Sequence, residues 1–136
     1  MARILVIDDD AAVATTIQIL MKADGFDVVA AHSGEAGLSL LAGEKFDLAI
    51  VDIFMPGMDG LKTIHAIRNK APLIPIIAVS GAMPAVAIGY ALDGLSIASN
   101  FTAVTSLRKP FRPDELRQAV RMLIAGRIYD AKTKSA

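Results

Sequence analysis

The sequence predicts an α/β protein of the flavodoxin-like, doubly wound type, with a five-stranded parallel sheet of order 2-1-3-4-5. Three observations support this fold class. Five short apolar runs alternate with segments whose apolar residues recur at helical spacing. The third run is apolar without a break, which is typical of a strand buried on both faces. The chain has 136 residues, the length of one domain with a sizeable core.

The five predicted strands are short, and each ends at a polar residue or at a turn signal. They cover residues 4–7, 27–31, 48–51, 74–79 and 103–107. Pro75 fits the fourth strand only near its start, because proline lacks the N–H group that a sheet needs. The third run ends on Asp52, where Pro56 and Gly57 force the backbone to leave the sheet at once.

The first three helical segments have recognisable start and stop signals. Asp10 is expected to cap the first helix, which Gly25 ends, and Ser33 to cap the second, which Gly43 closes. Asp59 is the expected cap of the third helix. Each apolar run is therefore followed by a helix of ordinary length, as a parallel sheet requires.

The last two helical segments differ in composition. A fourth helix is expected over residues 83–100, with a break near Gly94, and its apolar side chains are too many for one core. Some of them are expected to form a docking or homodimer surface. The final helix begins near Pro113, a residue favoured at the first helical position. We expect one domain over residues 1–128 and a polar, frayed tail over residues 129–136.

Composition excludes several classes of function. Fourteen acidic and fourteen basic residues give no net charge, so direct binding to nucleic acid or to an anionic membrane is not expected. The chain has no cysteine, which removes disulfides and thiolate chemistry. Proline and glycine divide the apolar stretch of residues 71–107 into pieces too short to span a bilayer. We therefore expect a cytoplasmic protein.

Polar residues follow four of the five predicted strands. Asp8 and Asp9 follow the first, Asp52 ends the third, Ser80 ends the fourth and Lys109 follows the fifth. Because parallel strands share one carboxyl-terminal edge, these side chains are expected to be neighbours. Three crowded carboxylates need protons or a cation, and oxygen ligands suit Mg²⁺. By themselves, residues 8–10 would more simply be a polar turn with a helix cap. The metal site is favoured because a further acid, Asp52, ends the central strand and a lysine follows the fifth strand.

Together these residue types indicate phosphoryl transfer. A carboxylate beside Mg²⁺, a lysine and a hydroxyl group can act as an oxygen nucleophile toward phosphorus. Asp52 is the candidate nucleophile, and Ser80 and Lys109 would contact the phosphoryl oxygens. Pro110 restricts the backbone of the preceding lysine, and a cis bond there would direct the amine toward the carboxylates. The product would be an aspartyl phosphate.

Four sequence blocks resemble the receiver domain of bacterial response regulators, and the likeness covers nearly the whole chain. They are Ile4-Leu5-Val6-Ile7-Asp8-Asp9-Asp10, Asp52-Ile53-Phe54-Met55-Pro56-Gly57-Met58-Asp59-Gly60, Val79-Ser80-Gly81 and Leu107-Arg108-Lys109-Pro110-Phe111. The resemblance implies a stand-alone phosphorylatable switch in two-component signalling. Asp52 would accept phosphate from a sensor histidine kinase or a histidine phosphotransfer protein.

The resemblance also implies roles for single residues. Asp9, Asp52 and the backbone carbonyl of Phe54 would bind Mg²⁺ directly, and Asp8 would act through a water molecule. Phosphorylation would draw the Ser80 hydroxyl inward and alter the face that residues 83–107 form with the final helix. That face would bind a downstream target protein. Such a protein promotes its own phosphotransfer and dephosphorylation and has no separate catalytic domain.

Two features depart from the family pattern. Three residues before the lysine, the family usually has an aromatic residue that rotates with the switch, and here the position is Ser106. Phe101 is the nearest substitute for that aromatic side chain. The separation of Ser80 from Lys109 is also longer than usual, which lengthens the predicted fourth helical region.

Three other functions are compatible with this fold. A phosphatase that forms an aspartyl phosphate needs a second acid two residues after the nucleophile, but that position is Phe54. A flavin-binding module would place a phosphate in the first loop, where residues 8–10 are all aspartates and would repel it. The third alternative is a receiver-like protein-binding scaffold that works without phosphorylation, which the Ser106 departure favours.

Overall fold

The protein folds around one parallel sheet. The structure is a computed structural model and describes residues 2–53, 55, 60–80 and 104–135. Within these residues, five parallel strands have the order β2-β1-β3-β4-β5, which confirms the predicted fold class. The strands are β1 (Arg3–Ile7), β2 (Asp27–Ala31), β3 (Leu48–Asp52), β4 (Ile76–Ser80) and β5 (Val104–Arg108).

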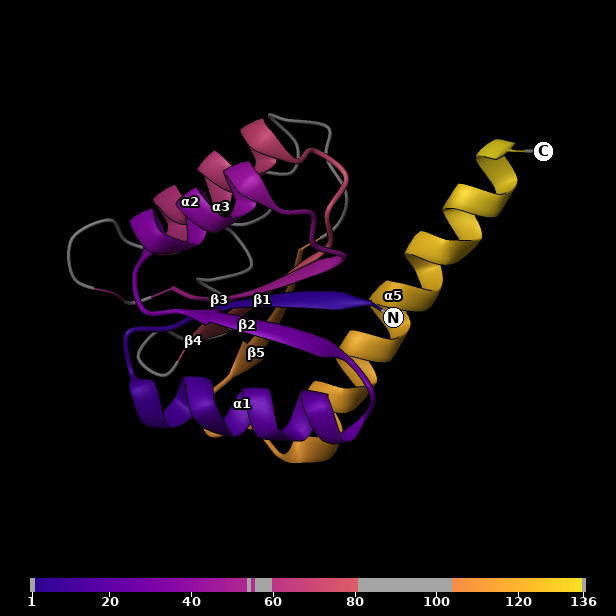
Figure 1. The fold of residues 1–136 in the computed structure, drawn as a ribbon. Helices are drawn as coiled ribbons and strands as arrows, with labels where there is room; N and C mark the ends of the chain where they lie inside the picture. Colours follow the sequence, from indigo (N-terminus) through magenta and orange to yellow (C-terminus); the bar gives the residue numbers. More distant parts are fainter. Residues whose placement is uncertain (1, 54, 56–59, 81–103, 136) are drawn as a thin grey trace.

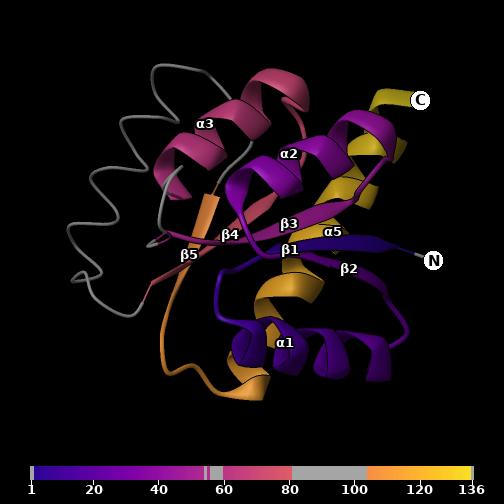
Figure 2. The same ribbon diagram turned by 60° about the vertical axis from the view of Figure 1, so that its left-hand side comes forward.

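Helices cover both faces of the sheet. They are α1 (Ala11–Ala23), α2 (Gly34–Gly43), α3 (Gly60–Lys70) and α5 (Pro113–Ser135). Helices α2 and α3 lie on one face, and α1 and the start of α5 lie on the other (Figure 1), an arrangement also seen in Figure 2. The helix predicted over residues 83–100 and the predicted cap Asp59 lie outside the described residues. Among the described helices, none is long and apolar enough to cross a membrane.

Each face of the sheet packs into its own hydrophobic core. In β1, Leu5 and Ile7 pack toward α2 and α3, whereas Ile4 and Val6 pack toward α1 and α5. The central strand β3 alternates in the same way, and all five of its residues are buried. This double burial explains its unbroken apolar run. Each large apolar side chain buried there stabilises the fold by roughly 1.5–3 kcal/mol.

The structure confirms the predicted start signals of α1 and α2. Asp10 accepts hydrogen bonds from two backbone N–H groups in the first turn of α1, at 3.0 and 3.3 Å. Ser33 Oγ accepts one from Ala36 N at 3.1 Å. Helix α1 ends just before Gly25, whose φ of 93° lies in the left-handed region that favours glycine. These local signals fix where the loops after β1 and β2 end and where the loop after α1 begins.

Two sequence predictions need correction. Strand β4 begins at Ile76 rather than at residue 74, so Pro75 precedes the strand and its missing N–H group does not interrupt the sheet. The frayed conformation predicted for residues 129–136 is wrong as far as Ser135, because α5 continues to that residue. After Gly126 the sequence has no glycine or proline to stop the helix. The domain boundary at residue 128 stays a prediction.

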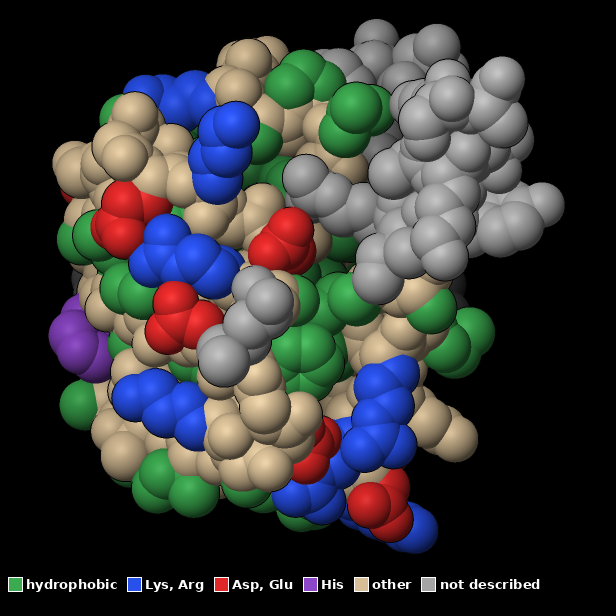
Figure 3. Space-filling model, turned by 45° about the vertical axis from the view of Figure 1, so that its right-hand side comes forward, with side chains coloured by type: hydrophobic (Ala, Val, Ile, Leu, Met, Phe, Trp, Pro, Cys, Tyr) green, Lys and Arg blue, Asp and Glu red, His purple; other side chains and the backbone are tan. Residues whose placement is uncertain are grey.

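Arg3 joins several segments at the amino-terminal edge of the sheet. Its guanidinium donates to Asp27 Oδ2 and Glu44 Oε1, each at 2.8 Å, and its Cζ lies 4.8 Å from the centroid of the Phe46 ring. Its backbone N–H donates to Asp47 Oδ2 at 2.7 Å. Hydrogen bonds to Glu44, and then to Asp27, raise the pKa of the guanidinium above its ordinary value. Figure 3 brings this side forward and shows acidic and basic side chains next to one another.

Candidate functional site

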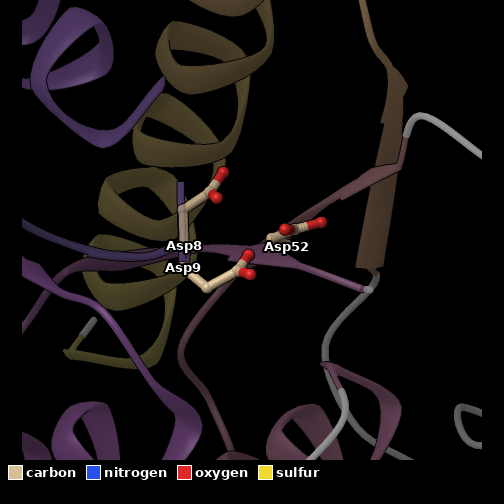
Figure 4. Close-up of side chains that lie close together, drawn as sticks. All are labelled: Asp8, Asp9 and Asp52. Carbon is tan, nitrogen blue, oxygen red and sulfur yellow. The ribbon is translucent and has the colours of Figure 1, made fainter. Parts of the chain in front are cut away.

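Three carboxylates meet at the carboxyl-terminal edge of the sheet. Asp8 and Asp9 directly follow β1, and Asp52 is the last residue of β3. One carboxylate oxygen from each residue lies within 4.8 Å of the others, and Figure 4 shows the three side chains close together. Asp8 and Asp52 are buried, whereas Asp9 is exposed. The predicted convergence of the three aspartates is therefore confirmed.

The pairing of β1 with β3 produces this convergence. Ile7 lies opposite Val51 in the parallel ladder, so the next residues of the two strands, Asp8 and Asp52, leave the sheet side by side. Asp10 N donates to Asp8 Oδ1 at 2.9 Å, which orients the Asp8 carboxylate. The other carboxylate oxygen of Asp8, Oδ2, therefore turns toward the centre of the site.

Lys109 supplies a cation to the same edge. Its Nζ lies 3.1 Å from Asp8 Oδ2 and 3.6 Å from Asp52 Oδ2. The backbone N–H of Lys109 donates to Ser80 O at 2.7 Å, which ties the lysine to the end of β4. The Lys109–Pro110 peptide bond is cis. With a cis bond here, we expected the lysine amine to be directed toward the carboxylates.

The charges at this edge do not balance. Among the described residues, three carboxylates and one lysine leave a formal charge of −2, with two of the carboxylates buried. Buried carboxylates this close together repel one another unless a cation neutralises them. The donor atoms are all oxygens, which suits a small, hard divalent ion. These residues therefore fit Mg²⁺, and among the described residues no other acidic or histidine cluster of this kind occurs.

Comparison with known proteins identifies the family. Residues 4–121 match the model of the response regulator receiver domain. The chain belongs to that family. Receiver domains are signalling switches of two-component systems rather than classical enzymes, and phosphorylation and Mg²⁺ binding are typical of them. The expected family membership and fold are thus confirmed together.

Individual relatives show how far the likeness extends. Cell cycle response regulator CtrA of Brucella ovis is 30% identical over 122 residues, which are 90% of this chain and 50% of that protein. The receiver domain thus spans about half the length of the curated relatives it matches.

Solved structures extend the likeness to the fold. A CheY-like receiver domain protein from Methanospirillum hungatei has a TM-score of 0.82 and 24% identity, covering 96% of this chain and 98% of that one. Response regulator TrrA from Thermotoga maritima, solved in complex with Mg²⁺-BeF, has a TM-score of 0.74 and 32% identity. That match covers 90% of this chain and 99% of TrrA.

Of the other residues predicted to act in the receiver domain, the structure describes Ser80 and Ser106. Ser80 is the last residue of β4 and is fully buried at the same edge as the aspartates. Ser106 lies in β5 and is exposed. Phe54 and Phe101 lie outside the described residues. The roles expected for these residues in metal binding and switching stay predictions.

Two residues next to the site did not emerge from the sequence. His32 directly follows β2, and its Nδ1 lies 3.3 Å from Asp8 O. Gly60 begins α3, and its backbone N–H donates to Ile53 O at 2.8 Å, one residue beyond Asp52. The position of His32 at a predicted strand end was an available signal. Gly60 lies in a sequence block that resembles the receiver domain, and a further signal is that glycine allows close approach of two backbones.

A hollow of about 480 Å³ adjoins the site between α1 and the segment after β5. Its walls are formed by Ala12, Val13, Thr16, Ile17, Lys109, Pro110 and Phe111. Because Lys109 is shared by the hollow and the carboxylate cluster, the hollow lies beside the aspartates. Apart from this lysine, the walls are mostly apolar.

Proposed function

We propose that this receiver domain is a phosphorylatable switch in which Asp52 accepts a phosphoryl group with Mg²⁺ bound. The donor is the phosphohistidine of a sensor histidine kinase or a histidine phosphotransfer protein. The observation that carries the proposal is the buried Asp52 carboxylate, grouped with two further acids and 3.6 Å from Lys109 Nζ. The family and the Mg²⁺-BeF complex of TrrA support it.

The transfer requires a nucleophile that stays ionised and in place. An oxygen of Asp52 attacks phosphorus while the P–N bond of the phosphohistidine breaks and the imidazole keeps the electron pair. The nearby ammonium of Lys109 favours the ionised form of Asp52 and afterwards pairs with a phosphoryl oxygen. The Ser80 hydroxyl donates a hydrogen bond to another of these oxygens. Water later attacks phosphorus and the new O–P bond breaks, which releases inorganic phosphate and returns Asp52 to a carboxylate.

The metal site follows from the same residues. Asp9 and Asp52 would hold Mg²⁺ directly, together with the carbonyl of Phe54, and Asp8 would act through water. The ion, when bound, supplies positive charge that neutralises the equatorial oxygens of the phosphoryl group. The three aspartates and Lys109 leave a charge of −2 at the site. A divalent cation would neutralise this charge, whereas a second lysine would neutralise only half of it.

We propose two surfaces for contacts with partner proteins. The hollow beside Lys109 suits an apolar helix face of the phosphodonor, because it opens next to the acceptor. The proposed output face includes β5 and α5, and it binds the downstream target or a second copy of the chain. Ser106, exposed on β5, lies on that face. The cytoplasmic location stays a prediction.

The first experiment is intact-mass measurement after incubation with Mg²⁺ and a small acyl phosphate. Wild type is expected to gain one hydroxylamine-labile phosphoryl group, and Asp52→Asn none. Asp114→Asn, which removes an exposed acid at the start of α5, is the matched control and should behave like wild type. An adduct that persists in Asp52→Asn would assign the acceptor elsewhere. No adduct from the acyl phosphate or from phosphorylated kinases would overturn the proposal.

A receiver-like scaffold that binds partners without phosphorylation is the second candidate. The observation that favours it is Ser106, an exposed residue where the family usually has a switching aromatic side chain. The scaffold predicts that Asp52→Asn leaves partner affinity unchanged, whether or not an acyl phosphate is present. The switch predicts that phosphorylation changes the affinity of wild type alone.

A further inference from the structure

The first residue of α3 lies directly against the backbone of the acceptor. A Cβ atom on Gly60 would lie 2.2 Å from the carbonyl oxygen of Asp52 and 2.2 Å from Cα of Ile53. Real Cβ atoms essentially never approach another heavy atom closer than 3.0 Å. Since both contacted atoms belong to the backbone, no rotation of a side chain can relieve the clash. A residue with a side chain at this position must move the main chain at Asp52.

Space, and not backbone conformation, demands glycine here. Among the described glycines, Gly25 has a positive φ, whereas Gly60 lies outside the left-handed region. An alanine could therefore adopt the same φ and ψ, and helix propensity alone would favour it. Gly60 is nonetheless buried, and its missing side chain is what allows α3 to meet the end of β3.

Ile53, the residue that follows Asp52, is held by backbone hydrogen bonds on both sides. Ile53 N donates to Val79 O at 2.9 Å, and Gly60 N donates to Ile53 O at 2.8 Å. The Ile53 side chain is buried in the same core as Ile64 of α3. The backbone after the acceptor is thereby fixed to β4 on one side and to α3 on the other.

We propose that Gly60 is a positioning residue for phosphoryl transfer to Asp52. By closing against the Asp52–Ile53 peptide, it holds the carboxylate within reach of Lys109 and the other aspartates. The inference rests on the proposed function and adds a requirement for α3, which supplies no phosphoryl or metal contact in that mechanism. Relief of the clash needs a contact to lengthen from 2.2 to at least 3.0 Å. A displacement near 1 Å at a reacting group costs roughly 100-fold in rate.

The test compares Gly60→Ala with wild type in the acyl phosphate assay, after circular dichroism has shown that both are folded. The variant is expected to show a phosphorylation rate constant about 100-fold lower. Its Mg²⁺ affinity should also fall, because Asp52 is displaced from Asp9. Equal rate constants and equal Mg²⁺ affinities for Gly60→Ala and wild type would overturn the inference.

Two control variants separate positioning from stability. Gly43→Ala adds a Cβ that meets no heavy atom within 4 Å, so it should phosphorylate like wild type. Leu61→Ala removes a partly buried side chain from the same turn of α3 and leaves the Gly60 contact intact. It should lower the melting temperature without changing the rate constant of the folded protein. A rate constant for Leu61→Ala as low as that for Gly60→Ala would count against positioning.

A measurement on wild type covers the case in which Gly60→Ala does not fold. If α3 and the acceptor are coupled, loading the site with Mg²⁺ and beryllofluoride should slow hydrogen exchange of the Gly60 amide by about 10-fold or more, the reciprocal effect expected of linkage. Unchanged exchange at Gly60 in a loaded protein would overturn the inference. Failure of wild type to accept phosphate would instead count against the proposed function, so the two failures are distinguishable.

Discussion

The two ends of the sheet contain similar charged residues in opposite circumstances. At the amino-terminal edge, Arg3 pairs with the side chains of Asp27 and Glu44, which are 48% and 40% exposed. At the carboxyl-terminal edge, the two carboxylates that contact Lys109 are only 3% and 6% exposed. A third acid, Asp9, adds a negative charge there, and Lys109 is the cation that pairs with this cluster among the described residues.

This difference separates an exposed charge cluster from the buried cluster for which we propose phosphoryl transfer. Water screens the ion pairs around Arg3, and such pairs contribute little to stability. Water screens the buried aspartates much less, so the negative charge that Lys109 does not neutralise persists until a further cation binds. Burial together with an uncompensated charge, rather than acidic residues as such, therefore distinguishes the proposed functional edge of the sheet.

The largest expected effect comes from removing the cation of the buried edge. Lys109→Met should lower the phosphorylation rate constant by roughly 100- to 1000-fold, because one stabilising charge is lost from the transition state. The same change should tighten Mg²⁺ binding, since the ammonium no longer repels the metal. Rates from time-resolved intact mass and affinities from titration calorimetry check both directions.

Lys70→Met is the control for this prediction, since it removes an exposed lysine from the last turn of α3. It should leave both quantities unchanged. Weaker Mg²⁺ binding in Lys109→Met would contradict the electrostatic account of the buried edge.

A smaller effect is expected when one of the three acids is neutralised. Asp9→Asn should raise the free energy of unfolding in metal-free buffer by up to about 1 kcal/mol, because an exposed member of the cluster no longer repels the others. Wild type should gain about 2.7 kcal/mol at Mg²⁺ concentrations of 100 times Kd, and the variant should lose most of that gain. Urea unfolding with Mg²⁺ or with a chelator measures both quantities.

Asp114→Asn again serves as the comparison for Asp9→Asn. If the Asp9 variant were less stable than wild type in the chelator, the three carboxylates would not be in repulsive contact. That result would remove the distinction drawn between the two edges.

The smallest effect is expected at the amino-terminal edge. Arg3→Met keeps an apolar stem near Phe46 and removes the ion pairs to Asp27 and Glu44. The melting temperature should fall slightly, and the difference from wild type should shrink at high salt, because the lost pairs are exposed. Phosphorylation should proceed at the wild-type rate. A slower rate would show that the two edges are coupled.

Local sequence signals were sufficient for the architecture and for the aspartates. The unbroken run of β3, bounded by Asp52, marked the central strand, and Asp10 and Ser33 marked the starts of two helices. Once the strand order is known, strand ends become neighbours without any further information. The convergence of Asp8, Asp9 and Asp52 is therefore predictable from the strand boundaries and the strand order.

Contacts that depend on exact register or close approach were not predictable. Arg3 meets partners 24 to 44 positions away, and their choice depends on how β1, β2 and the loop before β3 align. Gly60 ends one of the sequence blocks that resemble the receiver domain, but its contact with Asp52 is not visible until the distance is known. The predicted end of α5 was wrong because the polar residues after residue 128 were taken as the end of the helix. Lysine and alanine, which occur there, are good helix formers.

The direction of β1 has a practical consequence for assays. The strand starts at Arg3 and reaches Asp8 about 17 Å further along, so the amino-terminal end and the aspartates lie at opposite ends of the sheet. The chain contains no cysteine, so Ala2→Cys would introduce a single thiol beside Arg3. Coupled to a sensor chip through that thiol, every molecule would present its acidic edge to the solution, where a phosphodonor as large as a kinase can reach it.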